Sequence, residues 1–174
     1  MSLDSDIRLL SRVRLFAGFK PDHLRLLAFG AEARTLAKGT RIYRADSYSD
    51  GGYAVVHGKV DLIAGPHDSL ISTHGPASLL AEMALITDTA HAATAVTTEH
   101  TEVLKIPRPL FRRMLEEYPE LVPILQDRIS RSVGEFVAQL TVISAKLDHA
   151  SDLQQRREKA WAEAARQKHA DADE

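Results

Sequence analysis

The central part of the chain, residues 31–107, differs in texture from the sequence on either side of it. It consists of short runs rich in β-branched residues, separated by Gly, Asp, Ser and Pro. These runs are TRIYR, YAVVHGKVDLIA, SLISTH, AATAVTT and TEVLKI. Such runs are typical of β-strands, and His57-Gly58 between two of them predicts a tight hairpin turn. Several short strands in succession, without long helices between them, predict an antiparallel sandwich or barrel.

Helical patterns flank this β unit on both sides. Residues 3–15 alternate charge with apolar residues at the spacing of an amphipathic helix. A second helix is expected from Pro21, which suits a first helical position, to Gly30, which ends it. After the β unit, Pro109 opens a further helical pattern in PRPLFRRMLEEYPE.

From Pro119 the pattern stays helical to near the end of the chain, with apolar residues at alternating steps of four and three. This seam consists of Ile129, Val133, Phe136, Leu140, Ile143, Leu147 and Ala150. It either packs against the β unit or pairs with a second copy of the chain. One small domain would not bury so long a stripe, which favours a homodimer. Residues 1–150 are thus expected to form the domain, and residues 151–174 a charged, Ala-rich helical or disordered tail.

Composition limits the function classes. The chain has 174 residues, 22 Lys and Arg against 24 Asp and Glu, and no Cys. A net charge of −2 argues against general nucleic-acid binding, and the lack of Cys excludes disulfides and thiolate metal sites. The N-terminus does not resemble a signal peptide, and no apolar run reaches membrane-spanning length. We therefore expect a cytoplasmic protein without membrane contact. The sequence lacks nucleophile-elbow, P-loop and zinc-protease motifs, so we do not expect an enzyme.

Four segments, in order, resemble the cyclic nucleotide-binding domain family. VRLFAGFKPDHLRLLA resembles its opening helix pair, and GTRIYRADSYSDGGYAVVHGKVDL its first hairpins. GPASLLAEMALITDTAHAATAV resembles its phosphate-binding cassette, and VLKIPRPLFRRMLEEYPELVPIL the strand and helix that follow. The resemblance covers roughly residues 7–148. It implies an α+β, mainly β fold: an antiparallel jelly roll of the double-stranded β-helix type, between N-terminal helices and a long C-terminal helix. Such a sensor domain is similar to that of catabolite activators, but no helix-turn-helix domain follows, so no direct DNA binding is expected.

The resemblance also assigns roles within the cassette, Leu79–Thr94. In the family, a Gly-Glu pair opens a one-turn helix whose N–H groups face the cyclic phosphate, and the Glu accepts from the ribose 2′-hydroxyl. An Arg then binds the phosphate. Here Ala81 stands at the Gly position, Glu82 at the Glu position and His91 at the Arg position. The ligand-binding residues implied are Leu80, Ala81, Glu82, Met83, His91, Ala92, Ala93 and Thr94.

Each of these residues also has a simpler interpretation. Glu82 is either a ribose acceptor or a carboxylate at the start of a short helix. His91 is a phosphate donor, a pH-dependent switch or an exposed loop histidine, and the exposed histidine is favoured. Phe136 and Val137 fall where bacterial relatives place hydroxyl residues against the base. They either cover a purine or, as Phe136 on the seam indicates, pack against another helix.

Histidines concentrate around the cassette, at His67, His74, His91 and His100, but their spacing fits no standard metal-ligand motif. We expect no metal and no cofactor, with cyclic AMP or cyclic GMP as the possible ligand. Two functions remain open. The first is a stand-alone regulatory module that binds a cyclic nucleotide weakly, or another small ligand, and signals through the C-terminal helix. The second is a degenerate, non-binding domain that serves dimerisation and contact with a partner protein.

Overall fold

The computed structural model describes residues 2–131 of the chain. Internal contacts divide the chain into two parts, one up to residue 126 and one from residue 127 onward. The first part begins with helix α1 (Leu3–Leu10), a 3₁₀ turn η1 (Arg14–Phe16) and helix α2 (Pro21–Gly30). Eight strands follow, interrupted by a second 3₁₀ turn, η2 (Glu82–Leu85), and then comes helix α3 (Arg108–Glu117). The strands are β1 (Glu32–Leu36), β2 (Arg41–Tyr43), β3 (Gly51–His57), β4 (Val60–Ala64), β5 (Ser69–His74), β6 (Leu79–Leu80), β7 (Thr94–Thr97) and β8 (Thr101–Pro107).

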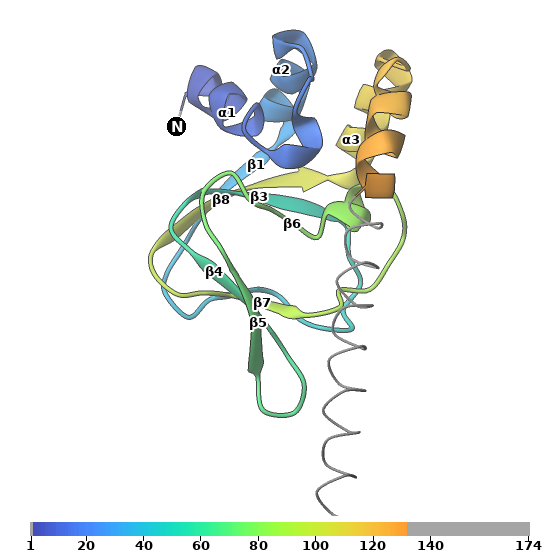
Figure 1. Ribbon diagram of the computed structural model, residues 1–174. Helices are drawn as coiled ribbons and strands as arrows, with labels where there is room; N and C mark the ends of the chain where they lie inside the picture. The colour runs from blue at the N-terminus through green and yellow to red at the C-terminus, as the bar shows by residue number, and fades with distance from the viewer. Residues whose placement is uncertain (1, 132–174) are drawn as a thin grey trace, which may run out of the picture. The chain divides into compact units, whose positions relative to one another are not determined.

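The strands form two four-stranded sheets with the orders β1-β8-β3-β6 and β2-β7-β4-β5, and their paired strands are antiparallel. A shared core joins the two sheets. It is made by Tyr53, Val55, Val60, Leu80, Ala95 and Val103. Burial alternates along β7, as in a strand with one inner face, whereas five consecutive residues of β3 are buried because helices cover the other face of its sheet (Figure 1). The predicted antiparallel sandwich is therefore confirmed, while closure into a double-stranded β-helix stays a prediction.

Two glycines are required by close backbone approach or by backbone angle. Gly58, in the turn between β3 and β4, has a φ of 84°, which is the left-handed region that favours glycine. A tight turn is therefore present at His57-Gly58, but the predicted hairpin is wrong: β3 and β4 lie in different sheets, so the turn carries the chain from one sheet to the other. Gly51 begins β3 opposite Pro107, where a Cβ atom would lie 2.2 Å from the carbonyl oxygen of Ile106. Glycine therefore allows β3 to pair with the end of β8, directly before α3.

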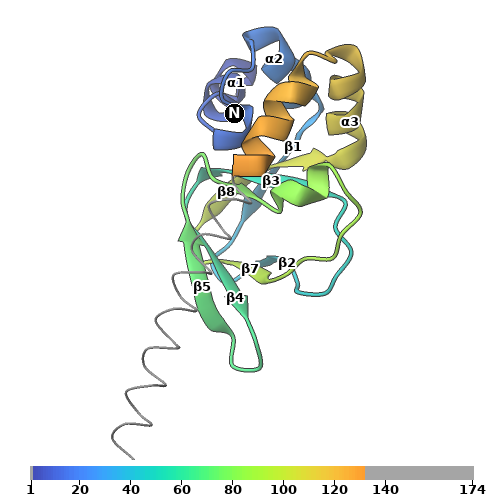
Figure 2. The same cartoon turned by 45° about the vertical axis from the view of Figure 1, so that its right-hand side comes forward.

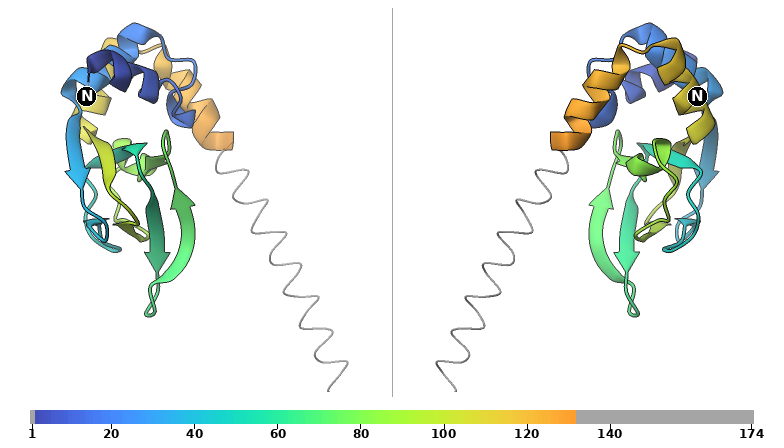
Figure 3. Two further views of the ribbon diagram at one scale, coloured as in Figure 1. Left: turned by 90° about the vertical axis from the view of Figure 1, so that its left-hand side faces the viewer. Right: turned by 90° about the vertical axis from the view of Figure 1, so that its right-hand side faces the viewer.

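Helices α1, α2 and α3 cover the face of the β1-β8-β3-β6 sheet that points away from the other sheet (Figures 1 and 2). Leu104 and Ile106 are buried on β8, and Phe16 and Phe111 pack with ring centroids 6.0 Å apart. The β4–β5 hairpin lies in the other sheet and extends away from the helices (Figure 3). The helices thus rest on the sheet whose strands β3, β6 and β8 border the cassette.

The N-terminal helix is shorter than the sequence pattern predicts. Helix α1 ends at Leu10, and Val13 has extended backbone angles before the turn η1 begins. Val13, Leu15 and Phe16 are all buried. A continuous helix would place Val13 and Leu15 on opposite faces, because residues two apart differ by about 200° around the axis. The break lets all three side chains enter the core.

The second part is described only over residues 127–131, which are helical. Arg131 pairs with Asp127 one turn earlier, with nitrogen and oxygen 2.8 Å apart, and Ile129 is half-buried. The other seam residues, and the predicted base-covering residues, lie outside the described part of the chain. They are Val133, Phe136, Val137, Leu140, Ile143, Leu147 and Ala150.

Candidate ligand site in the loop between strands six and seven

The loop between β6 and β7 opens with a reversal at Ala81. Ala81 is in the left-handed region, with φ 55° and ψ 41°, and the turn η2 begins directly after it. This confirms the one-turn helix expected at Glu82. The first N–H groups of such a turn have no partner within the turn, so the amides of Glu82 and Met83 are free to donate to a ligand. Leu80, just before the reversal, is buried in the core between the sheets.

Glu82 is half-buried at the start of η2. Burial raises the pKa of its carboxyl group, and the nearby Arg14 guanidinium partly opposes that rise. The residue has the position of a ribose acceptor and also that of an acidic residue in a first helical turn. Both interpretations stay open, because a carboxylate in either role lies at the same place.

His91 differs from its favoured interpretation. It is 6% exposed, and its ring stacks on the ring of Tyr43 with centroids 3.8 Å apart and planes 10° apart. The expectation of an exposed loop histidine is therefore wrong. The reason is contact with another segment: Tyr43 of β2 stacks on the ring, and backbone hydrogen bonds to Asp46 and Ser47 hold His91 beside it.

The charge of His91 follows from this position. Burial lowers the pKa of the imidazole, and the carboxylate of Asp50 opposes that shift to a smaller extent. A histidine whose pKa lies below its ordinary value of about 6.5 is neutral at pH 7. It therefore offers at most one N–H donor and no fixed positive charge.

The backbone of the cassette is tied to the loop between β2 and β3. The amide of Asp46 donates to the His91 carbonyl over 2.8 Å, and the His91 amide donates to the Ser47 carbonyl over 3.0 Å. Asp46 has a φ of 61°, and Ala45 and Asp46 form a turn. The Thr94 hydroxyl accepts from the Ala45 amide over 3.0 Å. Of the remaining predicted residues, Ala92 and Met83 are exposed and Ala93 is buried.

A cation contacts the cassette from outside, and the sequence interpretation did not include it. Arg108, the first residue of α3, is 6% exposed. Its Nε atom donates to the Ala84 carbonyl over 2.6 Å, and its Nη2 atom donates to the Ser49 carbonyl. Its Nη1 atom pairs with the Asp88 carboxylate and donates to the Tyr48 hydroxyl over 3.3 Å. We call these five residues the Arg108 cluster.

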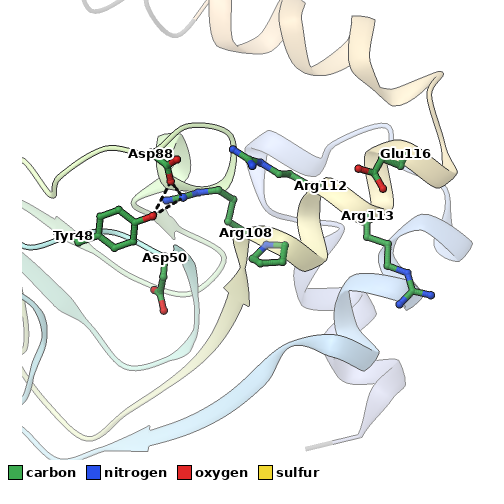
Figure 4. Close-up of a pocket in the computed structure, with 8 residues that line it drawn as sticks. Tyr48, Asp50, Asp88, Arg108, Arg112, Arg113 and Glu116 are labelled. Atoms are coloured by element: carbon green, nitrogen blue, oxygen red, sulfur yellow. Dashed lines mark hydrogen bonds and ion pairs between the residues drawn. The ribbon is translucent and has the colours of Figure 1, made fainter.

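The exposed side of the Arg108 cluster opens into a pocket of about 510 Å³ (Figure 4). The residues that line it are Tyr48, Asp50, Asp88, Arg108, Pro109, Arg112, Arg113 and Glu116. One feature of the sequence could have identified Arg108 as a residue with specific partners. The helix dipole disfavours a cation in the first turn of a helix, so a cation there needs other groups to stabilise it.

Among residues 2–131, no three His, Cys, Asp or Glu side chains come together as a metal site. None of the helices in this range combines the length and the apolar character that crossing a membrane requires.

Comparison with known proteins places these features in context. The cyclic nucleotide-binding domain family matches residues 33–118. A solved cyclic nucleotide-binding-like protein from Brucella abortus is 43% identical with a TM-score of 0.59, covering 65% of this chain and 99% of that one. The cyclic AMP receptor protein of Thermus thermophilus is 26% identical over 133 residues, which are 75% of this chain and 62% of the receptor. Lysophospholipase nte1 of Aspergillus fumigatus is 25% identical over 134 residues, but the match spans only 9% of that enzyme.

Proposed function

Because the chain belongs to the cyclic nucleotide-binding domain family, we propose that it is a regulatory module whose cassette binds a cyclic nucleotide weakly. The observation that carries this proposal is the state of His91. Its imidazole is buried, stacked on Tyr43 and neutral at pH 7. It cannot grip two phosphate oxygens with a positive fork, as an arginine does.

The loss of nucleotide affinity caused by His91 in place of an arginine can be estimated. A hydrogen bond to a charged group contributes about 1.5–3 kcal/mol, so its loss weakens binding by roughly ten- to a hundredfold. The remaining contacts are neutral donors and one acceptor. In the proposal, the amides of Glu82 and Met83 donate to the phosphate, and the carboxylate of Glu82 accepts from the ribose 2′-hydroxyl.

The turn geometry supports this division of roles. Ala81 has a left-handed backbone although it carries a Cβ, so the reversal that presents the two amides is retained without glycine. The helix dipole and the free N–H groups attract an anion without any side-chain cation. Weak binding is thus compatible with a cassette that contains neither Lys nor Arg.

A second function is favoured by a different observation. The Tyr43–His91 stack and the buried Leu80 occupy interior space beside the cassette. If these side chains fill the ligand volume, the domain is a non-binding module for dimerisation and protein contact. Its homodimer through the Ile129–Leu147 seam, and a protein partner for the C-terminal helix, are proposals drawn from the sequence pattern.

Isothermal titration with cyclic AMP and cyclic GMP, at pH 6 and at pH 8, separates the two functions. The regulatory module predicts weak binding at both pH values, and at pH 8, where His91 is neutral, this binding rests on the amides of Glu82 and Met83 and on the Glu82 carboxylate. The matched control is Glu82→Gln, which removes the carboxylate and keeps the size of the side chain. If neither nucleotide gives a measurable heat of binding at millimolar concentration at either pH, the binding proposal is wrong and the second function is favoured.

A further inference from the structure

Arg108 is a buried cation whose donors reach two separate segments of the fold. Its guanidinium binds the cassette at Ala84 and Asp88, and the β2–β3 loop at Tyr48 and Ser49. Its backbone amide also donates to the Asp50 carbonyl over 2.9 Å. The same residue is the first of α3. One residue therefore connects the cassette, the β2–β3 loop and the helix that follows the β unit.

Burial makes these contacts interdependent. A buried guanidinium is tolerated only where its donors are satisfied, because an unpaired charge in the interior is strongly destabilising. Displacing the Ala84 carbonyl would leave the Nε donor of Arg108 without a partner, although Arg108 is only 6% exposed. Movement of the cassette together with the first turn of α3 therefore costs less free energy than movement of either alone, because every donor of Arg108 stays paired.

The cluster has an exposed edge as well as a buried part. Tyr48 is 70% exposed and the side chain of Asp88 is 64% exposed, whereas Arg108 is buried. The Tyr48 hydroxyl donates to Asp88 over 2.8 Å and accepts from Arg108, which closes a ring of three polar groups. Water competes for this edge and not for the buried contacts. Opening of the cluster therefore begins at Tyr48 and Asp88.

We infer that Arg108 is a positioning residue that holds the cassette and the start of α3 together as one rigid body in the absence of ligand. Breaking the exposed contacts of Tyr48 and Asp88 with Arg108 allows the cassette and α3 to separate. The role of this body in signalling rests on the proposed function, because a ligand in the cassette is what would move it. The existence of this rigid body does not rest on the proposed function, because all of its contacts lie within the protein.

Hydrogen exchange of the full chain, measured amide by amide without ligand, tests the inference. In Asp88→Asn, which removes the charge from the edge, we expect the amides of residues 82–91 and 108–114 to exchange about tenfold faster or more, and to accelerate by the same factor. The amides of α2 should keep their wild-type rates. Asp88→Glu restores the carboxylate, so it should return both segments towards wild-type protection.

Arg112→Ala is the matched control. Arg112 lies on the same helix and donates to the Ile86 carbonyl over 3.3 Å, but it is exposed and outside the Arg108 cluster. We expect the exchange of residues 82–91 and 108–114 to stay close to wild type in this variant. Acceleration of the cassette alone in Asp88→Asn would overturn the inference, as would equal acceleration throughout α2, which marks general destabilisation.

A ligand arm keeps this test separate from the proposed function. Cyclic AMP at saturating concentration should slow exchange in residues 108–114 of the otherwise wild-type chain, and should slow only residues 82–91 in Asp88→Asn. A protein that binds no nucleotide would defeat the proposed function while the ligand-free comparison still decided the role of Arg108. Equal slowing of residues 108–114 with and without the Asp88 carboxylate would overturn the coupling.

Discussion

The imidazole of His91 lies flat on the ring of Tyr43, with ring centroids 3.8 Å apart and an angle of 10° between the planes. This stack stands where the family resemblance places a phosphate-binding arginine. A neutral, stacked ring is held by packing, whereas a phosphate-binding arginine is held by its ligand. The side chain at position 91 is therefore held in place by Tyr43, and no charged ligand is needed to position it.

Restoring the positive charge should strengthen binding. We expect His91→Arg to raise the affinity for cyclic AMP about ten- to a hundredfold, because a forked, charged donor returns to the phosphate. Titration calorimetry at pH 7 measures the change. His91→Ala is the control, since it removes the stack without adding charge and should bring no gain. Equal affinity of His91→Arg and wild type would contradict the proposed site.

The pH dependence of stability has a definite sign at His91. Burial lowers the pKa of the imidazole, so the folded protein binds this proton more weakly than the unfolded chain does. The stability due to neutral His91 is complete above the unfolded pKa of about 6.5 and is lost as the pH falls through the folded pKa. His91→Phe keeps an aromatic ring on Tyr43 but does not titrate. We expect it to lose less stability than wild type between pH 7 and pH 5.

Denaturant unfolding of both proteins at several pH values in that range measures this difference. Burial also lowers the pKa of His74, with Asp61 opposing the shift. His74 is present in both proteins, so its contribution cancels in the comparison. Parallel stability curves for the two proteins would show that His91 is not the group that titrates.

Much of the fold follows from local chemistry in the sequence. Pro21 stands at the first position of α2, and Leu24, Leu27 and Ala28 are buried on one face of it, as the pattern predicts. The run SLISTH corresponds to β5 from its first residue to its last. These features depend on backbone restriction and on the spacing of apolar side chains, which neighbouring residues determine.

The site could be predicted only in part, because its contacts join distant segments. The short helical turn that begins at Glu82 agrees with what the family resemblance implies for the cassette. The inward direction of the His91 side chain depends on Tyr43 in β2, and the flanking alanines give no contrast between the two sides of the chain. Arg108 is satisfied by residues of the cassette and of the β2–β3 loop. Sequence spacing carries no information about such partners.

Glu82 should show opposite effects on stability and on binding. Its pKa is raised by burial, so stability due to this group is present below the unfolded pKa of about 4.3 and is lost as the pH rises through the folded pKa. At pH 7 the charged carboxylate therefore opposes folding. We expect Glu82→Gln to be more stable than wild type at pH 7, as measured by denaturant unfolding, and to bind cyclic AMP about tenfold more weakly.

An analogue without the 2′-hydroxyl identifies the partner of this carboxylate. If Glu82 accepts from the ribose, the wild type should prefer cyclic AMP over 2′-deoxy cyclic AMP, and Glu82→Gln should bind the two equally. His91→Arg provides a background in which both affinities are easily measured. A preference that survives Glu82→Gln would assign the carboxylate to the helix start instead.

The apolar seam predicts the state of association. Leu140 lies at the middle of the seam, so a charge there would disrupt pairing with a second copy. We expect Leu140→Lys to be a monomer where the wild type is a dimer, as measured by light scattering after size exclusion. Gln139→Lys is the control, because it adds the same charge beside the seam. A wild-type chain that is monomeric at high concentration would refute the seam as a dimer interface.

The left-handed backbone at Ala81 predicts a stabilising substitution. A residue with a Cβ at a φ of 55° carries a steric cost that glycine does not. Ala81→Gly should therefore raise the free energy of unfolding by about 0.5–1 kcal/mol, measured with denaturant. Ala28→Gly is the control: it lies within α2, where glycine should cost about 1 kcal/mol. If Ala81→Gly destabilised as much as the control, the reversal would not be the strained element. If it stabilised and also tightened nucleotide binding, the Cβ of Ala81 would be what keeps the phosphate from the amides of Glu82 and Met83.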